Sequence, residues 1–453
     1  MPLNHADPDD PRTLPLRMKR ILAPTQPARG QLWLVQGGPG GSAWEDFNTL
    51  RRDMHDQVDD LDHYIIEHRG TGGQARLQCP QEQAQDSDGG AAITEGEWGD
   101  CVAHLQDAWG DQLDHFGTTD AAEDLRVAID AVKQPQDRVF VWGISYGTYQ
   151  LARYLWLAPD QADGVILEGI SPPGASFVQY SQAMNRAGQA LMEDCDQDPV
   201  CSERMGAPAW DVLQQTLDAI EAGHCAQLGA TVQDFFVPFF GTLLINRPLR
   251  DLLPAMIHRL QRCNADDRAV WANAYRTLFT GPGDPNRLGP AQTLFFHVAL
   301  SERWPTQGLS VEAAQQEEDG LLMSTALTLR IARRAQGWPT YPSPDPQYNA
   351  LPPAPQTPIL MLQGELDAAT PVEGARTVAQ HFDGPGQTYV EFPGGAHAVS
   401  DACGRQIAAQ FLNNPAATLD TTCAQNSELP VFDIPADIAQ FVFGTTDVWG
   451  DDL

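Results

Sequence analysis

The sequence predicts an α/β fold, in which a mostly parallel sheet is flanked by helices and a large helical cap is inserted before the last strands. In residues 1–172, short aliphatic runs alternate with helical patterns, as is typical of a parallel sheet covered by helices. Strand patterns are missing from residues 173–345 and return within residues 346–453. We therefore expect one discontinuous domain, made of residues 1–172 and 346–453, with the cap of residues 173–345 between its two parts.

The predicted strands are short runs of β-branched, aliphatic and aromatic residues bounded by turn residues. The clearest is the continuous apolar run that ends at Gly143, and the last two strands enclose an expected helix of residues 372–382. The expected strands are residues 31–36, 64–67, 138–143, 164–168, 358–363 and 387–392.

The predicted helices have apolar residues at helical spacing. Asp120, with Glu123 three residues later, resembles a capping box, and the helix that follows is expected to end near Lys133. Another helix is expected from Ser145 to the stop at Pro159. In the cap, helices are predicted at residues 210–222, 249–263 and 320–336, and the proline-rich residues 341–358 are interpreted as the return linker.

The formal net charge of the 453-residue chain is −32. Such a charge repels phosphate backbones and anionic lipid surfaces, so neither nucleic acid nor a membrane is expected as a partner. The longest apolar stretch, residues 235–245, is broken by Pro238 and Gly241 and is much shorter than the roughly 20 residues that cross a bilayer. The chain is therefore expected to be soluble.

The eight cysteines lie near turn-rich segments and lack the closely spaced pairs of a zinc site. Many pairings are possible, and eight buried free thiols in a cytosolic protein are the alternative. Disulfides are favoured, and they indicate a secreted or periplasmic protein. The start of the sequence has neither a basic nor an apolar leader segment, so the signal peptide is expected to have been removed. Local spacing favours Cys79 with Cys101, Cys195 with Cys201, and Cys403 with Cys423, which leaves Cys225 and Cys263.

A nucleophile motif follows the apolar strand of residues 138–143. Residues 143–147 read Gly-Ile-Ser-Tyr-Gly and match Gly-x-Ser-x-Gly, the strained turn that exposes a serine between a strand and a helix in the α/β-hydrolase fold. The required buried strand before the motif and helix after it are both present. The sequence therefore predicts the α/β-hydrolase fold, with Ser145 as the nucleophile.

A serine hydroxyl needs a histidine that accepts its proton and a carboxylate that orients this histidine. Asp367 comes directly after the strand of residues 358–363, and His397 follows the strand of residues 387–392 and two glycines. The chain order Ser, Asp, His is the order of this fold. We predict Ser145, Asp367 and His397 as the catalytic triad, with Glu365 as the alternative acid.

The oxyanion of the tetrahedral intermediate needs two backbone donors. The N–H of Tyr146, next to the nucleophile, is the expected first donor. Residues 36–42 read Gln-Gly-Gly-Pro-Gly-Gly-Ser after the first clear strand, and Gly38 is the expected second donor. A phosphate-binding loop is the alternative interpretation, but the Gly-Lys-Ser/Thr ending and the Gly-x-Gly-x-x-Gly spacing are both missing.

Further motifs accompany the Gly-x-Ser-x-Gly turn around Ser145, which is called the nucleophile elbow. They are Arg-Gly-Thr-Gly at residues 69–72, Gly-Glu-Leu-Asp-Ala-Ala-Thr-Pro at 364–371 and Gly-Gly-Ala-His at 394–397. Together with the glycine loop, they resemble the proline iminopeptidase and tripeptidyl aminopeptidase family of α/β hydrolases. The secreted tripeptidyl branch is the more similar, since it too is cysteine-rich and carries a large cap and a cysteine-bearing C-terminal segment. Gln36 departs from the usual His or Asn, and Glu67 from the usual aspartate.

The resemblance implies a serine exopeptidase that releases short peptides or single residues from a free N-terminus, with no metal or organic cofactor. It also implies a cap carboxylate that binds the substrate ammonium. Residues 297–302, His-Val-Ala-Leu-Ser-Glu, are similar to the segment that carries this carboxylate, which makes Glu302 the first candidate, although Leu300 replaces a cysteine. Glu168, at the end of a strand near the elbow, is the second candidate.

Two other functions compete with the exopeptidase. A carboxylesterase or amidase could use the same triad, because fold and triad do not fix the substrate. A dependence on the free amine of the substrate would separate these two. A non-catalytic binding module is less favoured, because such proteins usually lose the nucleophile or the base.

Overall fold

A computed structural model describes residues 1–280, 289–305, 308–342, 346–427 and 429–450. Within these residues the chain forms a seven-stranded sheet in the order β1-β3-β2-β4-β5-β6-β7. β1 pairs antiparallel with β3, and every other pair is parallel. This is the expected α/β-hydrolase sheet. Its strands are β1 (Met18–Ile21), β2 (Gly30–Val35), β3 (Leu61–Ile66), β4 (Arg138–Ile144), β5 (Gly164–Glu168), β6 (Ile359–Gly364) and β7 (Gln387–Phe392).

Two strands differ from the prediction by more than one residue at an end. β1 was not predicted, because its four residues, Met-Lys-Arg-Ile, form a half-exposed edge strand without an apolar run. β3 begins three residues before the predicted start, since the polar Asp62 and His63 hide its pattern. Asp62 is nevertheless buried, where it accepts hydrogen bonds from Arg20 and from the Ala23 N–H.

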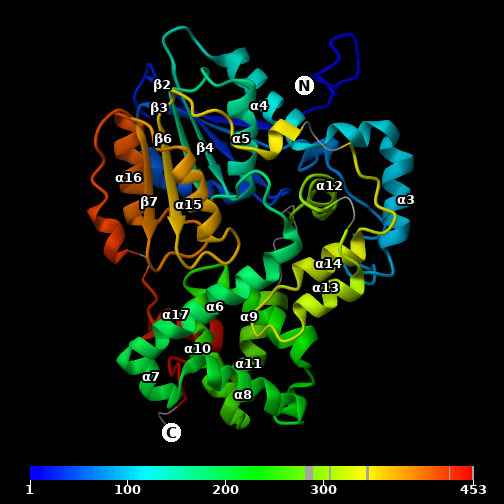
Figure 1. The fold of residues 1–453 in the computed structure, drawn as a ribbon, viewed down its shortest axis with the longest axis vertical. Helices are drawn as coiled ribbons and strands as arrows, with labels where there is room; N and C mark the ends of the chain where they lie inside the picture. Colours follow the sequence, from blue (N-terminus) through cyan, green and yellow to red (C-terminus); the bar gives the residue numbers. More distant parts are fainter. Residues whose placement is uncertain (281–288, 306–307, 343–345, 428, 451–453) are drawn as a thin grey trace.

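Helices cover both faces of the sheet (Figure 1). Alternate residues of β4 point to opposite faces. Phe140 and Trp142 pack in one layer with α2 (Asn48–Gln57) and α16 (Ala402–Asn413). Val139 and Val141 pack in the other layer with α4 (Thr118–Val132), α5 (Tyr146–Leu157) and α15 (Val372–His381). The short α1 (Ala43–Asp46) follows the glycine loop, and α3 (Trp98–Trp109) lies outside these layers.

The described chain between β5 and β6 contains helices and no strand, in agreement with the predicted helical insertion. Figure 1 shows α6 to α11 beyond one edge of the sheet and α12 to α14 nearer α3. These helices are α6 (Tyr180–Gln197), α7 (Pro199–Met205), α8 (Ala209–Glu221), α9 (Val237–Leu244), α10 (Leu253–Arg262), α11 (Ala265–Tyr275), α12 (Gln292–Glu302), α13 (Val311–Glu318) and α14 (Leu327–Arg334). The division of the chain at residues 172 and 345 stays a prediction, and residue 345 lies outside the described residues.

Two helix starts differ from the prediction. The helix expected at residues 320–336 begins only at Leu327, because Asn185 of α6 accepts the backbone N–H groups of Leu322 and Met323. The expected capping box at Asp120 does not form, and α4 instead begins at Thr118. A carboxylate from α12 accepts the Thr118 N–H, as described below.

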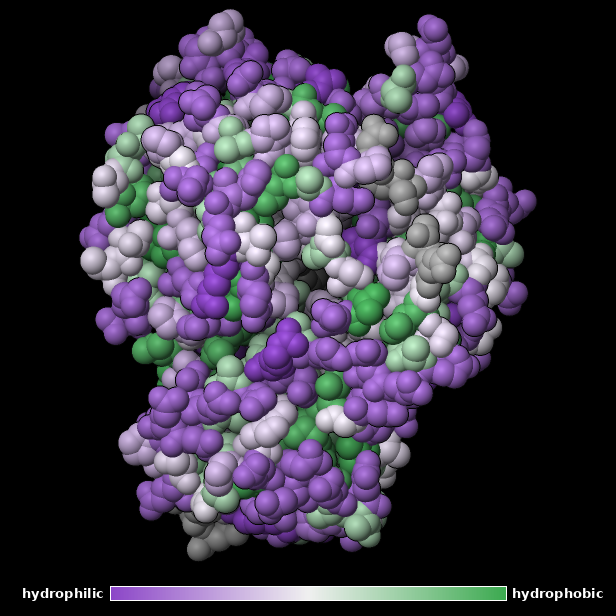
Figure 2. Space-filling model, viewed as in Figure 1, coloured by the Kyte–Doolittle hydropathy of each residue, from purple (hydrophilic) through white to green (hydrophobic). Residues whose placement is uncertain are grey.

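The C-terminal helix α17 (Ala436–Phe443) returns to the inserted helices and packs on α11. Val442 and Phe443 lie in one buried cluster with Trp271 of α11 and with Phe236 and Phe240 of the insertion. In the described residues, no helix has the length and apolar character needed to cross a membrane. On the face shown in Figure 2, hydrophilic residues predominate and hydrophobic ones form only small groups.

All eight cysteines are paired, and the predicted pairs are confirmed. Each such cross-link typically stabilises a protein by about 2–4 kcal/mol. The pairs are Cys79–Cys101, Cys195–Cys201, Cys225–Cys263 and Cys403–Cys423.

Candidate active site

Ser145 lies at the turn between β4 and α5, where its backbone has φ 59° and ψ −125°. The turn is tight because its two glycines touch other backbone atoms. A Cβ atom on Gly147 would lie 2.3 Å from the Val35 carbonyl oxygen, and one on Gly143 would lie 2.7 Å from Gly147. Side chains at either position would push the turn open. The local sequence therefore places the serine as the elbow motif predicts.

Asp367 and His397 are brought together by the loops after β6 and β7. The Nδ1 atom of His397 is 2.9 Å and 3.0 Å from the two carboxylate oxygens of Asp367. Asp367 is buried and also accepts hydrogen bonds from Thr370 through its N–H and Oγ1 and from the Ala369 N–H. The alternative acid, Glu365, is half-exposed and pairs with Arg376 instead.

Asp367 and His397 shift each other's pKa values. Burial opposes charge on His397, but the charge and hydrogen bond of Asp367 outweigh burial and raise the pKa of His397 above its ordinary value of 6.5. Burial likewise disfavours the charged form of Asp367, yet the His397 charge and the Thr370 hydrogen bonds lower the pKa of Asp367. An ionised Asp367 therefore holds His397 with its proton on Nδ1 and its Nε2 free to act as a base.

Hydrolysis is expected to depend on pH through His397. Only the neutral imidazole can accept a proton, and the raised pKa keeps the imidazolium at higher pH. The plot of kcat/KM against pH should therefore rise with a midpoint above 6.5, the ordinary histidine value. A midpoint below that value, with the protein folded throughout by circular dichroism, would contradict the role of Asp367.

The glycine loop lies against the nucleophile. A Cβ atom on Gly37 would lie 2.6 Å from Cβ of Ser145, and the Gly37 N–H donates to Oε1 of Gln36 at 2.7 Å. Gly38, the predicted second oxyanion donor, has φ 112° and lines the cavities at Ser145. Glu67 holds the end of this loop, because its carboxylate accepts hydrogen bonds from Ser42 Oγ and the Ala43 N–H.

Two cavities meet at Ser145. One, of about 790 Å³, is lined by Ser145 and His397, and the other, of about 350 Å³, is lined by Ser145, Tyr146 and Thr370. Three side chains from the inserted helices line both cavities: Tyr180 of α6, Phe295 of α12 and Leu327 of α14. The insertion therefore forms the wall opposite the elbow.

Glu302 does not lie where the sequence predicted an ammonium anchor. Its side chain is 1 % exposed, and its carboxylate lies 3.6 Å from the equally buried guanidinium of Arg153. It also accepts hydrogen bonds from the Thr118 N–H at 2.9 Å, Tyr149 at 2.7 Å and Tyr341 at 2.5 Å. These three hydrogen bonds and the ion pair take up most of the acceptor capacity of the carboxylate. Glu302 therefore joins α12 to the starts of α4 and α5 instead of facing substrate.

Glu168, the second predicted anchor, is fully buried at the end of β5 and is not among the residues that line either cavity. Its carboxylate accepts a hydrogen bond from Nε1 of Trp142 at 3.0 Å, and burial raises its pKa. The backbone carbonyl of Glu168 accepts the Ser145 N–H at 2.9 Å. Glu168 therefore supports the elbow through its backbone, and its side chain does not reach a substrate in these cavities.

Several charged side chains that line the cavities were not predicted from the sequence. Glu373, in the first turn of α15, is exposed and lines the smaller cavity, as do the exposed Arg186 and the buried Arg303. Arg330 and Arg405 line the larger cavity. The start of the helix after the Asp367 loop was a usable signal for Glu373. No local pattern marked Arg330, because its place depends on how α14 packs.

Comparisons with known proteins give one family match and a set of similar solved structures. Residues 325–423 match the family model described as TAP-like protein, and this range includes Asp367 and His397. Among curated proteins the sequence has no significant match. Solved structures with similarity include a proline iminopeptidase from Mycobacterium smegmatis, with a TM-score of 0.38, 15% identity and coverage of 88% of this chain and 94% of the other. Another is a monoacylglycerol lipase from Paleococcus ferrophilus, with a TM-score of 0.37, 13% identity and coverage of 89% and 100%.

At these TM-scores the structural likenesses support no conclusion about activity. The assignment of the fold rests on the strand order and the elbow of this chain itself.

Proposed function

Because the chain is an α/β hydrolase whose residues 325–423 match the TAP-like family, we propose that it is a serine exopeptidase acting at the free N-terminus of short peptides. The observation that carries the proposal is the hydrogen-bonded pair of Asp367 and His397, which shares a cavity with the elbow Ser145 under the inserted helices. A cavity of about 790 Å³ is in the range that encloses small ligands. Side chains of α6, α12 and α14 wall this cavity on one side, and such a restriction favours cleavage near a chain end.

In the proposed reaction, His397 takes the proton of Ser145 Oγ as this oxygen attacks the scissile carbonyl. The backbone N–H groups of Tyr146 and Gly38 stabilise the oxyanion of the tetrahedral intermediate. His397 then protonates the leaving amine, and the acyl-enzyme on Ser145 remains. Water, activated by the same histidine, releases the acyl part.

The position of His397 indicates in which direction the peptide lies across the two cavities. The leaving amine must lie near the histidine that protonates it, and His397 lines the larger cavity. The leaving part of the peptide is therefore assigned to the larger cavity and the acyl part, with its free ammonium, to the smaller one. Glu373 is the carboxylate of the smaller cavity among the described residues, so we assign it to the ammonium.

The test of this function compares the anilide of Ala-Ala-Pro with a free N-terminus and the same anilide N-acetylated, with Ser145→Ala as the blank. Only the free amine should be hydrolysed. Glu373→Gln should raise KM for the free anilide about 10- to 100-fold, the usual worth of a hydrogen bond to a charged group. Glu312→Gln, at an exposed position of α13, is the matched control.

Equal hydrolysis of the acetylated anilide, or hydrolysis of simple esters alone, would contradict the exopeptidase. The carboxylesterase or amidase with the same triad would then take its place. If only the free amine reacts but Glu373→Gln leaves KM unchanged, the exopeptidase stands and Glu373 is not the anchor.

The four disulfides support a protein of an oxidising compartment, because cytosolic thiols are kept reduced. We therefore place the proposed activity outside the cytosol, in secreted or periplasmic protein.

A further inference from the structure

The larger cavity at Ser145 has a charge opposite to that of the whole protein. The chain has 60 acidic and 28 basic residues, not counting histidine. Yet Arg330 and Arg405 line this cavity, and its described lining residues include no aspartate or glutamate. An ammonium group gains nothing in such a cavity, whereas an anion does.

The two arginines differ in their partners. Arg405 donates to the Ser400 carbonyl at 2.6 Å and lies 3.4 Å from the carboxylate of Asp53. In the part of the chain that the structure describes, no side chain or carbonyl pairs with the guanidinium of Arg330. Arg330 is exposed, so its guanidinium is open to a ligand, although partial burial lowers its pKa. A guanidinium that lines a cavity and has no protein partner is suited to bind an anion that enters the cavity.

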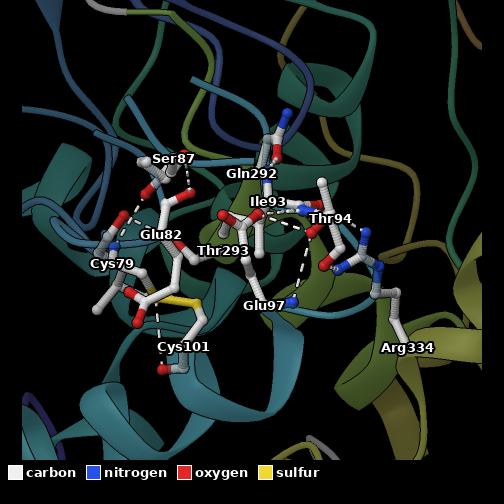
Figure 3. Close-up of a disulfide and its surroundings, with 12 residues drawn as sticks. Cys79, Glu82, Ser87, Ile93, Thr94, Glu97, Cys101, Gln292, Thr293 and Arg334 are labelled. Carbon is white, nitrogen blue, oxygen red and sulfur yellow. Dashed lines mark hydrogen bonds between the residues drawn. A yellow bond between two sulfur atoms is a disulfide. The ribbon is translucent and has the colours of Figure 1, made fainter. Parts of the chain in front are cut away.

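The helix that carries Arg330 is fixed from outside the cavity. One turn further along α14, Arg334 donates to the Ile93 carbonyl at 2.7 Å and to the Thr94 carbonyl at 3.3 Å. Gln292, at the start of α12, accepts the Ile93 N–H at 3.3 Å and lines the cavity. Figure 3 shows these contacts beside the Cys79–Cys101 disulfide, which closes the loop of residues 79–101. These contacts hold α14 in place, and so they fix the position of Arg330 in the cavity wall, as a binding group requires.

The lining around Arg330 is otherwise largely apolar, with Leu50, Phe295, Phe296 and Leu327 among its residues. A guanidinium in apolar surroundings recognises a planar carboxylate through two parallel hydrogen bonds. His397 lines the same cavity, so the group that Arg330 binds belongs to the part of the substrate that leaves.

We propose that Arg330 binds a carboxylate on the leaving part of the substrate, so that the preferred substrates are short peptides with a free C-terminal carboxylate. This proposal rests on the exopeptidase function and on the orientation of the substrate given above. A carboxylate could also come from an acidic side chain near the C-terminus, and the experiment separates the two sources.

The experiment measures kcat/KM for tetra-alanine, for its C-terminal amide, and for the amide of Ala-Ala-Ala-Asp. Whichever bond is cut, the leaving part keeps the C-terminus. The wild-type protein should prefer the free acid to the amide about 10- to 100-fold. Arg330→Gln should bring this ratio close to one, and Arg330→Lys should restore part of it. Arg333→Gln should keep the wild-type ratio, because Arg333 pairs with Glu95 at the surface. If the amide of Ala-Ala-Ala-Asp is cleaved at the rate of the free acid, an acidic side chain is enough to supply the carboxylate that Arg330 binds.

Calorimetric binding of the same peptides to Ser145→Ala protein, with and without Arg330→Gln, gives the preference without turnover. If peptides are cleaved but acid and amide behave alike, the carboxylate site is wrong and the exopeptidase stands. If only esters are cleaved, the exopeptidase function is wrong, and the binding data alone decide whether Arg330 binds a carboxylate. Tighter binding of the acid than of the amide, lost in Arg330→Gln, supports this carboxylate site. Equal binding of acid and amide overturns it.

Discussion

Replacement of Asp367 by Asn is expected to lower kcat about 10⁴-fold while the protein remains folded. The carboxylate accepts the Nδ1 proton of His397, together with hydrogen bonds from Ala369 and Thr370. An amide offers one oxygen and one NH₂ group, and the NH₂ group would favour the tautomer with the proton on Nε2. Nε2 could then no longer accept the proton of Ser145.

The measurement is the steady-state rate on the best peptide substrate, with Glu365→Gln as the matched control. Glu365 lies two residues away and pairs with Arg376 on the surface, so its loss should leave kcat within about twofold, as for other exposed pairs. The substitution Asp367→Asn should also lower the midpoint of the pH profile, because His397 loses the charge that raises its pKa. A kcat that falls less than tenfold would remove Asp367 from the triad.

Replacement of Glu302 by Gln is expected to lower the free energy of unfolding by about 3–5 kcal/mol, the usual cost of leaving one member of a buried ion pair alone. Arg153 would lose its anionic partner in a place where both side chains are 1 % exposed. The Thr118 N–H at the start of α4 and the hydroxyls of Tyr149 and Tyr341 would share a weaker acceptor.

Urea unfolding followed by circular dichroism measures this effect, with the exposed Glu312→Gln as control. The two roles considered for Glu302 give different results. A stable Glu302→Gln protein whose KM rises only for substrates with a free amine would return Glu302 to the role of ammonium anchor.

The parts of the molecule that could be predicted from the sequence are those set by local chemistry. The elbow around Ser145 requires glycines at fixed positions, and the loops with Asp367 and His397 directly follow apolar strands. The disulfide pairs were also close in sequence. The parallel pairing of the strands then brings the carboxyl ends of β4, β6 and β7 to the same side of the sheet.

The positions of the charged side chains in and around the site could not be predicted in this way, because they depend on contacts far apart in the chain. Glu302 and Thr118 are joined across 184 positions, and Arg334 reaches Ile93 across 241. A glutamate in a helix looks the same in sequence whether it faces substrate or an arginine in the core. The edge strand β1 was missed for a related reason, since its partner strand β3 supplies most of its order.

The packing of α17 on α11 sets an order of events in biosynthesis. Residues 436–443 leave the ribosome long after the inserted helices, yet Val442 and Phe443 complete the buried cluster around Trp271. Until they arrive, the insertion exposes apolar surface to any neighbouring chain. The protein therefore reaches its final form only after synthesis of α17, and a nascent chain halted before this helix would be a substrate for chaperones or proteases.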